Sequence, residues 1–210
     1  SENYDYMQLV LLSGGSGKRL CPLSNNVRSK QFLPLLEKED GTIESMVQRV
    51  VRQAKAAGLT NAITLATNTS QLDIITNQLG DTVSVVTEPE CRDTFPAIAL
   101  AASYLHFAKC CADDEVIVIM PCDPYTEADY FETIGKMVEC VKRDVAELVL
   151  MGITPTYPSE KYGYVMPIAS DNEYKMVSYF TEKPTVERAK SSLPKTHTGT
   201  EEYSHSAWAT

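Results

Sequence analysis

Short apolar runs alternate along the chain with longer segments whose apolar residues recur at helical spacing. Five runs are near-continuous stretches of apolar or β-branched residues, typical of strands in a sheet covered on both faces: residues 7–12, 62–66, 83–87, 115–120 and 147–152. The segments between them predict helices over residues 43–57, 71–79, 96–108 and 129–141. This alternation predicts βαβ units with right-handed crossovers, and hence an α/β fold: a three-layer α/β/α sandwich around a mostly parallel sheet.

The pattern changes after residue 152. Residues 164–167 and 177–181 predict two strands of a small antiparallel ribbon. A short helix is predicted from 182 to 190, with Pro184 early in its first turn. Residues 191–210 show little apolar periodicity and offer little surface to bury, so we expect one domain over 1–190 followed by an atypical, disordered tail over 191–210.

The composition is that of an ordinary globular protein, with 43% hydrophobic and 22% charged residues. The formal net charge of -9, without a basic stripe, argues against a nucleic-acid polymer as partner. No apolar run approaches the ~20 residues of a membrane span, and there is no secretory pattern at the N-terminus, so we expect a cytoplasmic protein without a membrane partner. Six scattered cysteines and only three histidines argue against a zinc site, a disulfide scaffold and a histidine-based hydrolase.

The segment that follows the first predicted strand is rich in glycine. Residues 12–24 are LSGGSGKRLCPLS, where three glycines would let backbone N–H groups approach a phosphate and two basic residues add positive charge. The spacing fits neither a Walker A loop nor a dinucleotide-binding fingerprint. From this loop alone, a triphosphate site and an ordinary glycine turn with solvated basic residues both stay open.

Asp123 follows the fourth predicted strand, at the edge of a parallel sheet where ligands commonly bind. Its carboxylate is a hard oxygen ligand suited to Mg²⁺, which usually takes one or two protein carboxylates. The residue type alone leaves open the alternative that Asp123 caps a turn or a helix.

An ordered series of segments resembles the sugar-1-phosphate nucleotidyltransferase family, whose members join a nucleoside triphosphate to a sugar 1-phosphate and release pyrophosphate. The matching segments are residues 12–24, 29–33, 87–89, 92–102, 121–123, 152–156, 162–165 and 180–184. Among them, Gln31-Phe32 and residues 92–102 resemble the mannose-1-phosphate guanylyltransferase branch. The resemblance covers residues 7 to about 190 and implies the Rossmann-like fold of that family.

The resemblance also implies roles for individual residues. The catalytic residues would be Arg19 and Lys30, which neutralise phosphate charge during in-line attack by the sugar phosphate oxygen, and Asp123, which holds Mg²⁺. The residues expected to bind the nucleotide are Leu12, Ser13, Gly14, Gly15, Ser16, Gly17, Lys18, Glu88, Arg92 and Pro96. The residues expected to bind the sugar phosphate are Gly163, Glu182 and Lys183, although Glu182 and Lys183 alone would equally suit a solvated pair at a helix start.

The chain departs from the family pattern after Lys190, because the family's Trp-Asn-x-Gly sugar-binding strand is missing. Deletion of one base at the Lys190 codon would explain the change, since restoring the frame permits a Trp-Asn-Gly-Gly-Val-Phe segment. We therefore expect a frameshifted or truncated chain that ends before the family's second metal-binding Asp. Cys21 and Cys91 also stand where that branch has Trp and Gly.

The leading hypothesis is a Mg²⁺-dependent enzyme that transfers a nucleotidyl group from GTP to mannose 1-phosphate, giving GDP-mannose and pyrophosphate. One alternative is the same reaction with another nucleoside triphosphate and sugar phosphate. A second alternative is a non-catalytic nucleotide-sugar-binding fragment, because one metal ligand and part of the sugar site are expected to be missing. The sequence does not decide the oligomeric state, and a homo-oligomer is one of the open alternatives.

Overall fold

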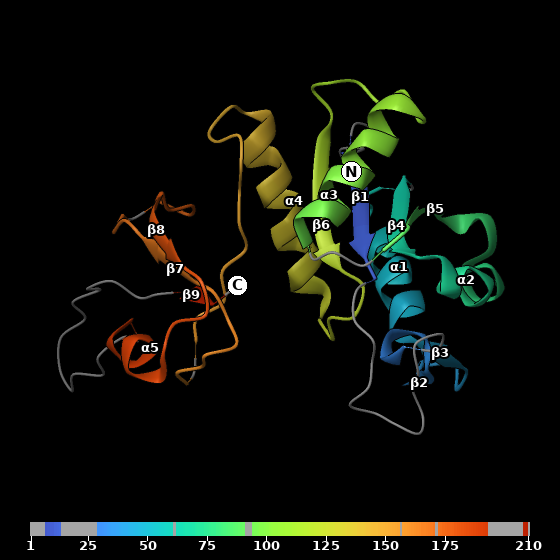
Figure 1. Cartoon of the computed structure of the whole chain (residues 1–210), viewed down its shortest axis with the longest axis horizontal. Helices are drawn as coiled ribbons and strands as arrows, with labels where there is room; N and C mark the ends of the chain where they lie inside the picture. The colour runs from blue at the N-terminus through green and yellow to red at the C-terminus, as the bar shows by residue number, and fades with distance from the viewer. Residues whose placement is uncertain are drawn as a thin grey trace. The chain divides into compact units, whose positions relative to one another are not determined.

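The computed structural model describes residues 7–13, 29–60, 62–90, 94–155, 157–170, 172–192 and 208–209. The chain divides into two compact units, Ser1–Glu147 and Leu148–Thr210. Figure 1 shows the elements of both units, and each unit is described by itself below. Within the ranges just given, no helix is both long and apolar enough to cross a membrane.

The first unit is built on a four-stranded parallel sheet. Its strands are β1 (Met7–Leu12), β4 (Ile63–Asn68), β5 (Ser84–Glu88) and β6 (Val116–Pro121), in the spatial order β5-β4-β1-β6. Leu9, Val10 and Leu11 of β1 are fully buried, because an interior strand of a parallel sheet is covered on both faces. The first four predicted strands are therefore confirmed, with boundaries shifted by at most two residues.

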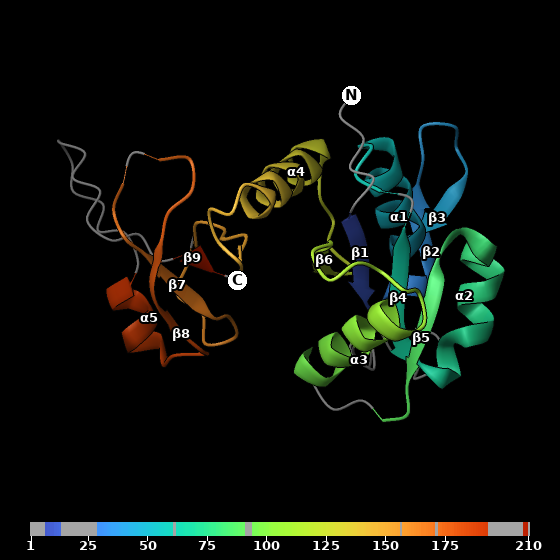
Figure 2. The same cartoon turned by 90° about the horizontal axis from the view of Figure 1, so that it is seen from above.

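Helices cover both faces of this sheet. They are α1 (Met46–Ala56), α2 (Leu72–Leu79), α3 (Thr94–Phe107) and α4 (Ala128–Lys142). Figure 2 shows α3 on one side of the sheet and α1 with α4 on the other. Ala101 and Leu105 of α3 pack on Val10, Ala66 and Val86, one from each of three neighbouring strands. The predicted three-layer sandwich is confirmed.

The helix predicted over 43–57 is wrong in its first three residues. Ile43–Ser45 forms strand β3, which pairs antiparallel with β2 (Pro34–Glu37). The hydroxyl of Ser45 accepts a hydrogen bond from the Gln48 backbone N–H, and the Gln48 side chain accepts one from the Ser45 N–H. This capping box starts α1 at Met46, although Ile43 fits the helical spacing.

The strand predicted over 147–152 is wrong, because these residues have no regular secondary structure. Leu148 and Leu150 are 77% and 47% exposed. An apolar run becomes a strand only where a neighbouring strand can hydrogen-bond to it. Among the described strands, none pairs with this segment.

The second unit contains the predicted antiparallel ribbon. β7 (Tyr164–Pro167) pairs with β8 (Val177–Thr181) on one side and with β9 (Trp208–Ala209) on the other. The helix predicted over 182–190 begins later than expected, as α5 (Val186–Ser192). Lys183 precedes Pro184, and the residue before a proline is disfavoured in helical conformation, so the helix does not begin at residue 182. Ala189 of this helix is buried against Tyr164 and Met166 of β7.

Candidate functional site

Lys30 and Asp123 form an ion pair at the carboxyl end of the parallel sheet. Lys30 opens the short 3-10 helix η2 (Lys30–Phe32), and Asp123 follows directly after β6 and Cys122. Gln31, the residue after Lys30, donates to Ser13 directly after β1. Because β1 and β6 are paired in parallel, Lys30 and Asp123 lie at the same edge of the sheet. Their side chains are 53% and 31% exposed, which leaves both charges accessible to a ligand.

A buried hydrogen-bond network lies beneath this pair. Gln71, which ends the 3-10 helix η3 (Thr69–Gln71), is 1% exposed. Its amide oxygen accepts from the hydroxyls of Ser13, at 3.0 Å, and Thr67, while its amide nitrogen donates to the Ser29 hydroxyl at 2.7 Å. The Gln31 amide donates in turn to the Ser13 hydroxyl at 3.0 Å. All five residues are buried, so the network satisfies polar groups that water does not reach.

Sequence reasoning assigned no role to Gln71, Thr67 or Ser29. Gln71 lies in a segment that the apolar pattern places at the start of a helix, where a glutamine is ordinarily solvated. The one available signal was its position directly after a buried strand, at the edge of the sheet where ligands bind. That signal is weak, since burial of a polar side chain depends on contacts with distant segments.

Cys122 anchors the segment that carries Asp123. Its backbone N–H donates to the Leu12 carbonyl at 3.2 Å, and its side chain is 2% exposed. Burial, followed by the charge of Asp123, raises the pKa of the Cys122 thiol to about 12, and a hydrogen bond with Ser13 opposes that rise. The thiol is therefore neutral, and its role is to pack beneath the carboxylate.

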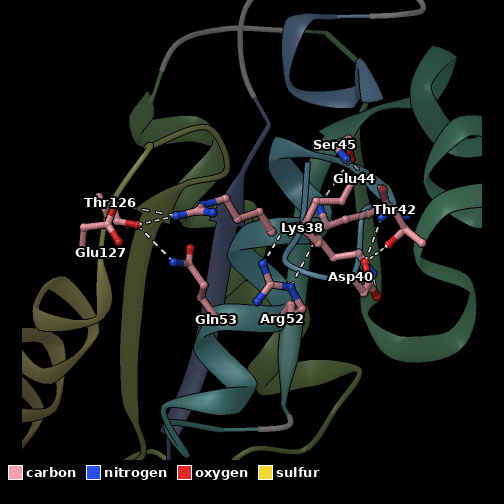
Figure 3. Close-up of polar contacts among 11 residues, drawn as sticks. Lys38, Asp40, Thr42, Glu44, Ser45, Arg52, Gln53, Thr126 and Glu127 are labelled. Atoms are coloured by element: carbon pink, nitrogen blue, oxygen red, sulfur yellow. Dashed lines mark hydrogen bonds and ion pairs between the residues drawn. The ribbon is translucent and has the colours of Figure 1, made fainter. Parts of the chain in front are cut away.

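The chain after Asp123 is held by α1. The side-chain amide of Gln53 donates to the Thr126 carbonyl at 3.0 Å, as Figure 3 shows, and Arg49 donates to the same carbonyl at 3.2 Å. The guanidinium of Arg49 also lies 4.6 Å from the centre of the Tyr125 ring. These contacts fix the loop between β6 and α4 against α1.

The other nucleotide-binding predictions divide into two groups. Leu12 and Ser13 lie at the end of β1, Glu88 ends β5, and Pro96 lies in the first turn of α3. Burial raises the pKa of the Glu88 carboxyl above its ordinary value. Six of the glycine-loop residues and one later residue lie outside the described residues: Gly14, Gly15, Ser16, Gly17, Lys18, Arg19 and Arg92.

The second unit brings together the three residues predicted to bind the sugar phosphate. The pairing of β7 with β8 sets Tyr164 opposite Thr181, so that Gly163 and Glu182 are neighbours. A Cβ atom at Gly163 would lie 3.1 Å from Glu182 Oε2 and would overlap the ring atom Cζ of Phe180. Lys183 Nζ lies 3.1 Å from Glu182 Oε1, and its backbone has a φ of +38°, which is unusual for a residue other than glycine.

The donor set near Asp123 fits a magnesium ion that shares its coordination with phosphate oxygens. Among the residues that the structure describes, no three His, Cys, Asp or Glu side chains form a complete metal cluster. Mg²⁺ does not need one, because it keeps several waters and commonly binds through one or two carboxylates together with substrate phosphates. Asp123 supplies one accessible carboxylate of this kind.

Comparison with known families decides the class of protein. The nucleotidyl transferase family matches this chain over residues 8–206. The chain belongs to the nucleotidyl transferase family. Its α/β fold, with a central parallel sheet and small antiparallel sheets, is the fold of solved nucleotidyl transferase structures.

Curated members of this nucleotidyl transferase family resemble the chain over most of its length. A mannose-1-phosphate guanylyltransferase of Salmonella montevideo is 30% identical in an alignment of 199 residues that covers 88% of this chain and 39% of that protein. Another, of Sinorhizobium fredii, is 32% identical in an alignment of 191 residues that covers 88% of this chain and 36% of that protein. The chain thus spans well under half the length of these relatives.

A solved structure supports the fold of this nucleotidyl transferase. The structure described as a mannose-1-phosphate geranyltransferase from Thermus thermophilus matches with a TM-score of 0.75 at 24% identity. The match covers 97% of this chain and 55% of that one. At this identity the likeness concerns the fold alone.

Proposed function

We propose that this chain transfers a nucleotidyl group from GTP to mannose 1-phosphate, giving GDP-mannose and pyrophosphate. The observation that carries the proposal is the accessible Lys30–Asp123 ion pair at the carboxyl end of the parallel sheet, in a chain of the nucleotidyl transferase family. The curated relatives named mannose-1-phosphate guanylyltransferase favour this base and this sugar.

Lys30 acts on the triphosphate. Its ammonium group lies at the sheet edge on a buried 3-10 turn, and it stabilises negative charge on the phosphates as the sugar phosphate oxygen attacks in line. The attacking oxygen is already anionic, so no general base is required. Arg19, in the glycine-rich segment, is proposed to share this role.

Asp123 is the proposed carboxylate ligand of Mg²⁺. When bound, Mg²⁺ neutralises phosphate charge and orients the triphosphate. Lys30 already offsets the charge of Asp123 in the structure, and nucleotide binding would give the ammonium group a phosphate partner instead. Glu88, whose pKa burial raises, is proposed to face the nucleoside rather than the phosphates.

Glu182 and Lys183 are the proposed sugar-phosphate residues. The Glu182 carboxylate can accept hydrogen bonds from sugar hydroxyls, and the Lys183 ammonium group can pair with the phosphate. Gly163 lets the Phe180 ring and the Glu182 carboxylate lie close to its backbone, because a Cβ atom there would overlap the ring. The unusual φ of Lys183 is a form of local strain that is common at binding sites.

A thermal-melt panel with Mg²⁺ tests the binding step. GTP, ATP, UTP, dTTP and GDP-mannose are added separately, and a ligand at about 100 times its dissociation constant stabilises the fold by about 2.7 kcal/mol. We expect a selective rise in Tm with GTP and GDP-mannose. A selective rise in Tm with UTP or dTTP would mean that uracil or thymine, rather than guanine, is the base that the chain recognises. An unchanged Tm with every nucleotide would refute nucleotide binding.

Pyrophosphate release tests turnover. We expect release with GTP and mannose 1-phosphate together and none when either is omitted. Binding of GDP-mannose without release would favour a non-catalytic nucleotide-sugar-binding protein instead. The cytoplasmic location stays a prediction, and the oligomeric state stays open.

A further inference from the structure

The Gln71 amide connects segments that are far apart in the sequence. It bonds to Ser13 at the end of β1, to Thr67 within β4 and to Ser29 directly before η2. One amide group thus uses both its donor and its acceptor to join three segments at the edge of the sheet. A buried side chain with both ends of its amide engaged has one favourable orientation, and it fixes its partners accordingly.

Two of the residues in this network flank Lys30. Ser29 and Gln31 are 0% and 2% exposed, and both are hydrogen-bonded within the network, while the Lys30 side chain between them is half exposed. The buried neighbours therefore hold the backbone on both sides of Lys30 and direct its side chain outward.

The same network reaches the other member of the ion pair. Cys122 directly precedes Asp123, and its side chain is buried. The Cys122 backbone N–H is bonded to Leu12, the residue before Ser13. Both Lys30 and Asp123 are thus attached, one residue away, to groups that Gln71 orders.

We propose that Gln71 is a positioning residue for the Lys30–Asp123 pair, acting through Ser13, Ser29 and Gln31. The structural part of this inference stands on the hydrogen bonds alone, and its catalytic consequence rests on the proposed nucleotidyl transfer. Because a misplacement of about 1 Å in a reacting constellation can cost about 100-fold in rate, a residue of this kind controls turnover without touching substrate.

The structural part is tested by the reactivity of Lys30 with an amine-acylating reagent, measured by peptide mass spectrometry in the absence of nucleotide. Lys38, which pairs with Asp40 at 3.4 Å on the β2–β3 turn, serves as an internal reference. Gln71→Met keeps the length of the side chain but removes its hydrogen bonds. We expect a several-fold rise in the Lys30/Lys38 labelling ratio, and an unchanged ratio would overturn the proposal.

The catalytic part is tested by steady-state kinetics with GTP and mannose 1-phosphate. We expect Gln71→Met to lower kcat by about 10–100-fold with little change in KM, as for other residues that orient a reacting group. A change confined to KM, or an unchanged kcat, would contradict a positioning role. If the unsubstituted protein releases no pyrophosphate, the proposed function fails while the labelling ratio still decides the role of Gln71.

Two further variants separate positioning from loss of stability. Arg52→Met removes a partner of the buried Glu44 in the same unit and serves as the destabilised control, whose labelling ratio and kcat should stay at the unsubstituted values. Equal effects of Arg52→Met and Gln71→Met would overturn the proposal. If Gln71→Met does not fold, Ser29→Ala replaces it, because this substitution removes a single hydroxyl group of the network. The Lys30/Lys38 labelling ratio of Ser29→Ala is then expected to rise, and an unchanged ratio would overturn the proposal.

Discussion

Lys30 and Asp123 are paired across the end of the parallel sheet although neither side chain is buried. An exposed ion pair contributes at most about 1 kcal/mol to the free energy of unfolding, because water solvates both charges well. The pair therefore contributes little to the stability of the fold. In the proposed function, the pair holds a cation and an anion at the point where we propose that a phosphate and a metal ion bind.

Lys30→Met and Asp123→Asn should each abolish most of the activity and leave the fold intact. We expect kcat/KM for pyrophosphate release to fall by about 100–1,000-fold, the effect of removing one charge-stabilising group from an active site. The free energy of unfolding should change by less than about 1 kcal/mol. Lys38→Met, at an exposed ion pair on the β2–β3 turn, is the matched control and should keep full activity. A comparable loss in this control would contradict the assignment.

The buried thiol of Cys122 should make the fold sensitive to alkaline pH. Its pKa is raised from 9.0 to about 12 in the folded state, so the unfolded chain loses the proton first as the pH rises. Stability is therefore fully present below pH 9 and falls by about 1.4 kcal/mol per pH unit above it, until the folded thiol ionises as well. Urea denaturation at several pH values measures this slope.

Two cysteine variants give the control for that measurement. Cys122→Ala should lose the slope, whereas Cys140→Ala, at a half-buried thiol on α4, should keep it. Equal slopes in both variants would assign the alkaline sensitivity to other groups.

The pair formed by Glu44 and Arg52 predicts an asymmetry between two substitutions. Arg52 donates to both carboxylate oxygens of Glu44, at 2.5 and 3.1 Å (Figure 3). The Glu44 side chain is buried, whereas that of Arg52 is half exposed. Arg52→Met leaves a buried carboxylate unpaired and should cost about 1–3 kcal/mol. Glu44→Gln leaves an arginine that water can solvate and should cost less. The reverse order in urea denaturation would show that the carboxylate is not the buried partner.

Gly163 and Phe180 should be coupled in stability and in sugar-phosphate binding. Gly163→Ala places a methyl group in the space of the Phe180 ring and should cost about 1 kcal/mol, the low end for an overpacked site. The double variant with Phe180→Leu should recover most of that loss, which a double-mutant cycle measures. Additive effects of the two substitutions would mean that the ring moves aside freely.

Most of the central sheet could be predicted from the sequence, because its interior strands β1 and β4 are covered on both faces and consist mainly of apolar or β-branched residues. The predictions failed where pairing with another strand determines whether a segment forms a strand. Ile43 joined a hairpin because β2 was available to pair with it, and residues 147–152 stayed irregular because no described strand pairs with them. Local composition carries no information on such partners.

In the candidate site too, local motifs could be predicted from the sequence, whereas contacts between distant segments could not. Lys30, Asp123, Gly163, Glu182 and Lys183 were predicted from motif order, and the structure pairs Lys30 with Asp123 and brings Gly163, Glu182 and Lys183 together. Gln71 was missed because its importance comes from being buried between segments distant in sequence. The predicted roles of these residues stay predictions until tested. The frameshift expected after Lys190 also stays a prediction, since residues 193–207 lie outside the described part of the chain.

The register between β1 and β6 constrains how this region can change in length. Pro121 stands opposite Leu12, and the next residue bonds back to Leu12 before the chain leaves the sheet. Successive strand residues face opposite sides, so an insertion or deletion of one residue within β6 would turn the carboxylate of Asp123 away from Lys30. We therefore expect related chains that use this pair to vary in residue identity along Val116–Pro121 rather than in residue number. The connection that precedes β6 is free of this constraint and can tolerate insertions.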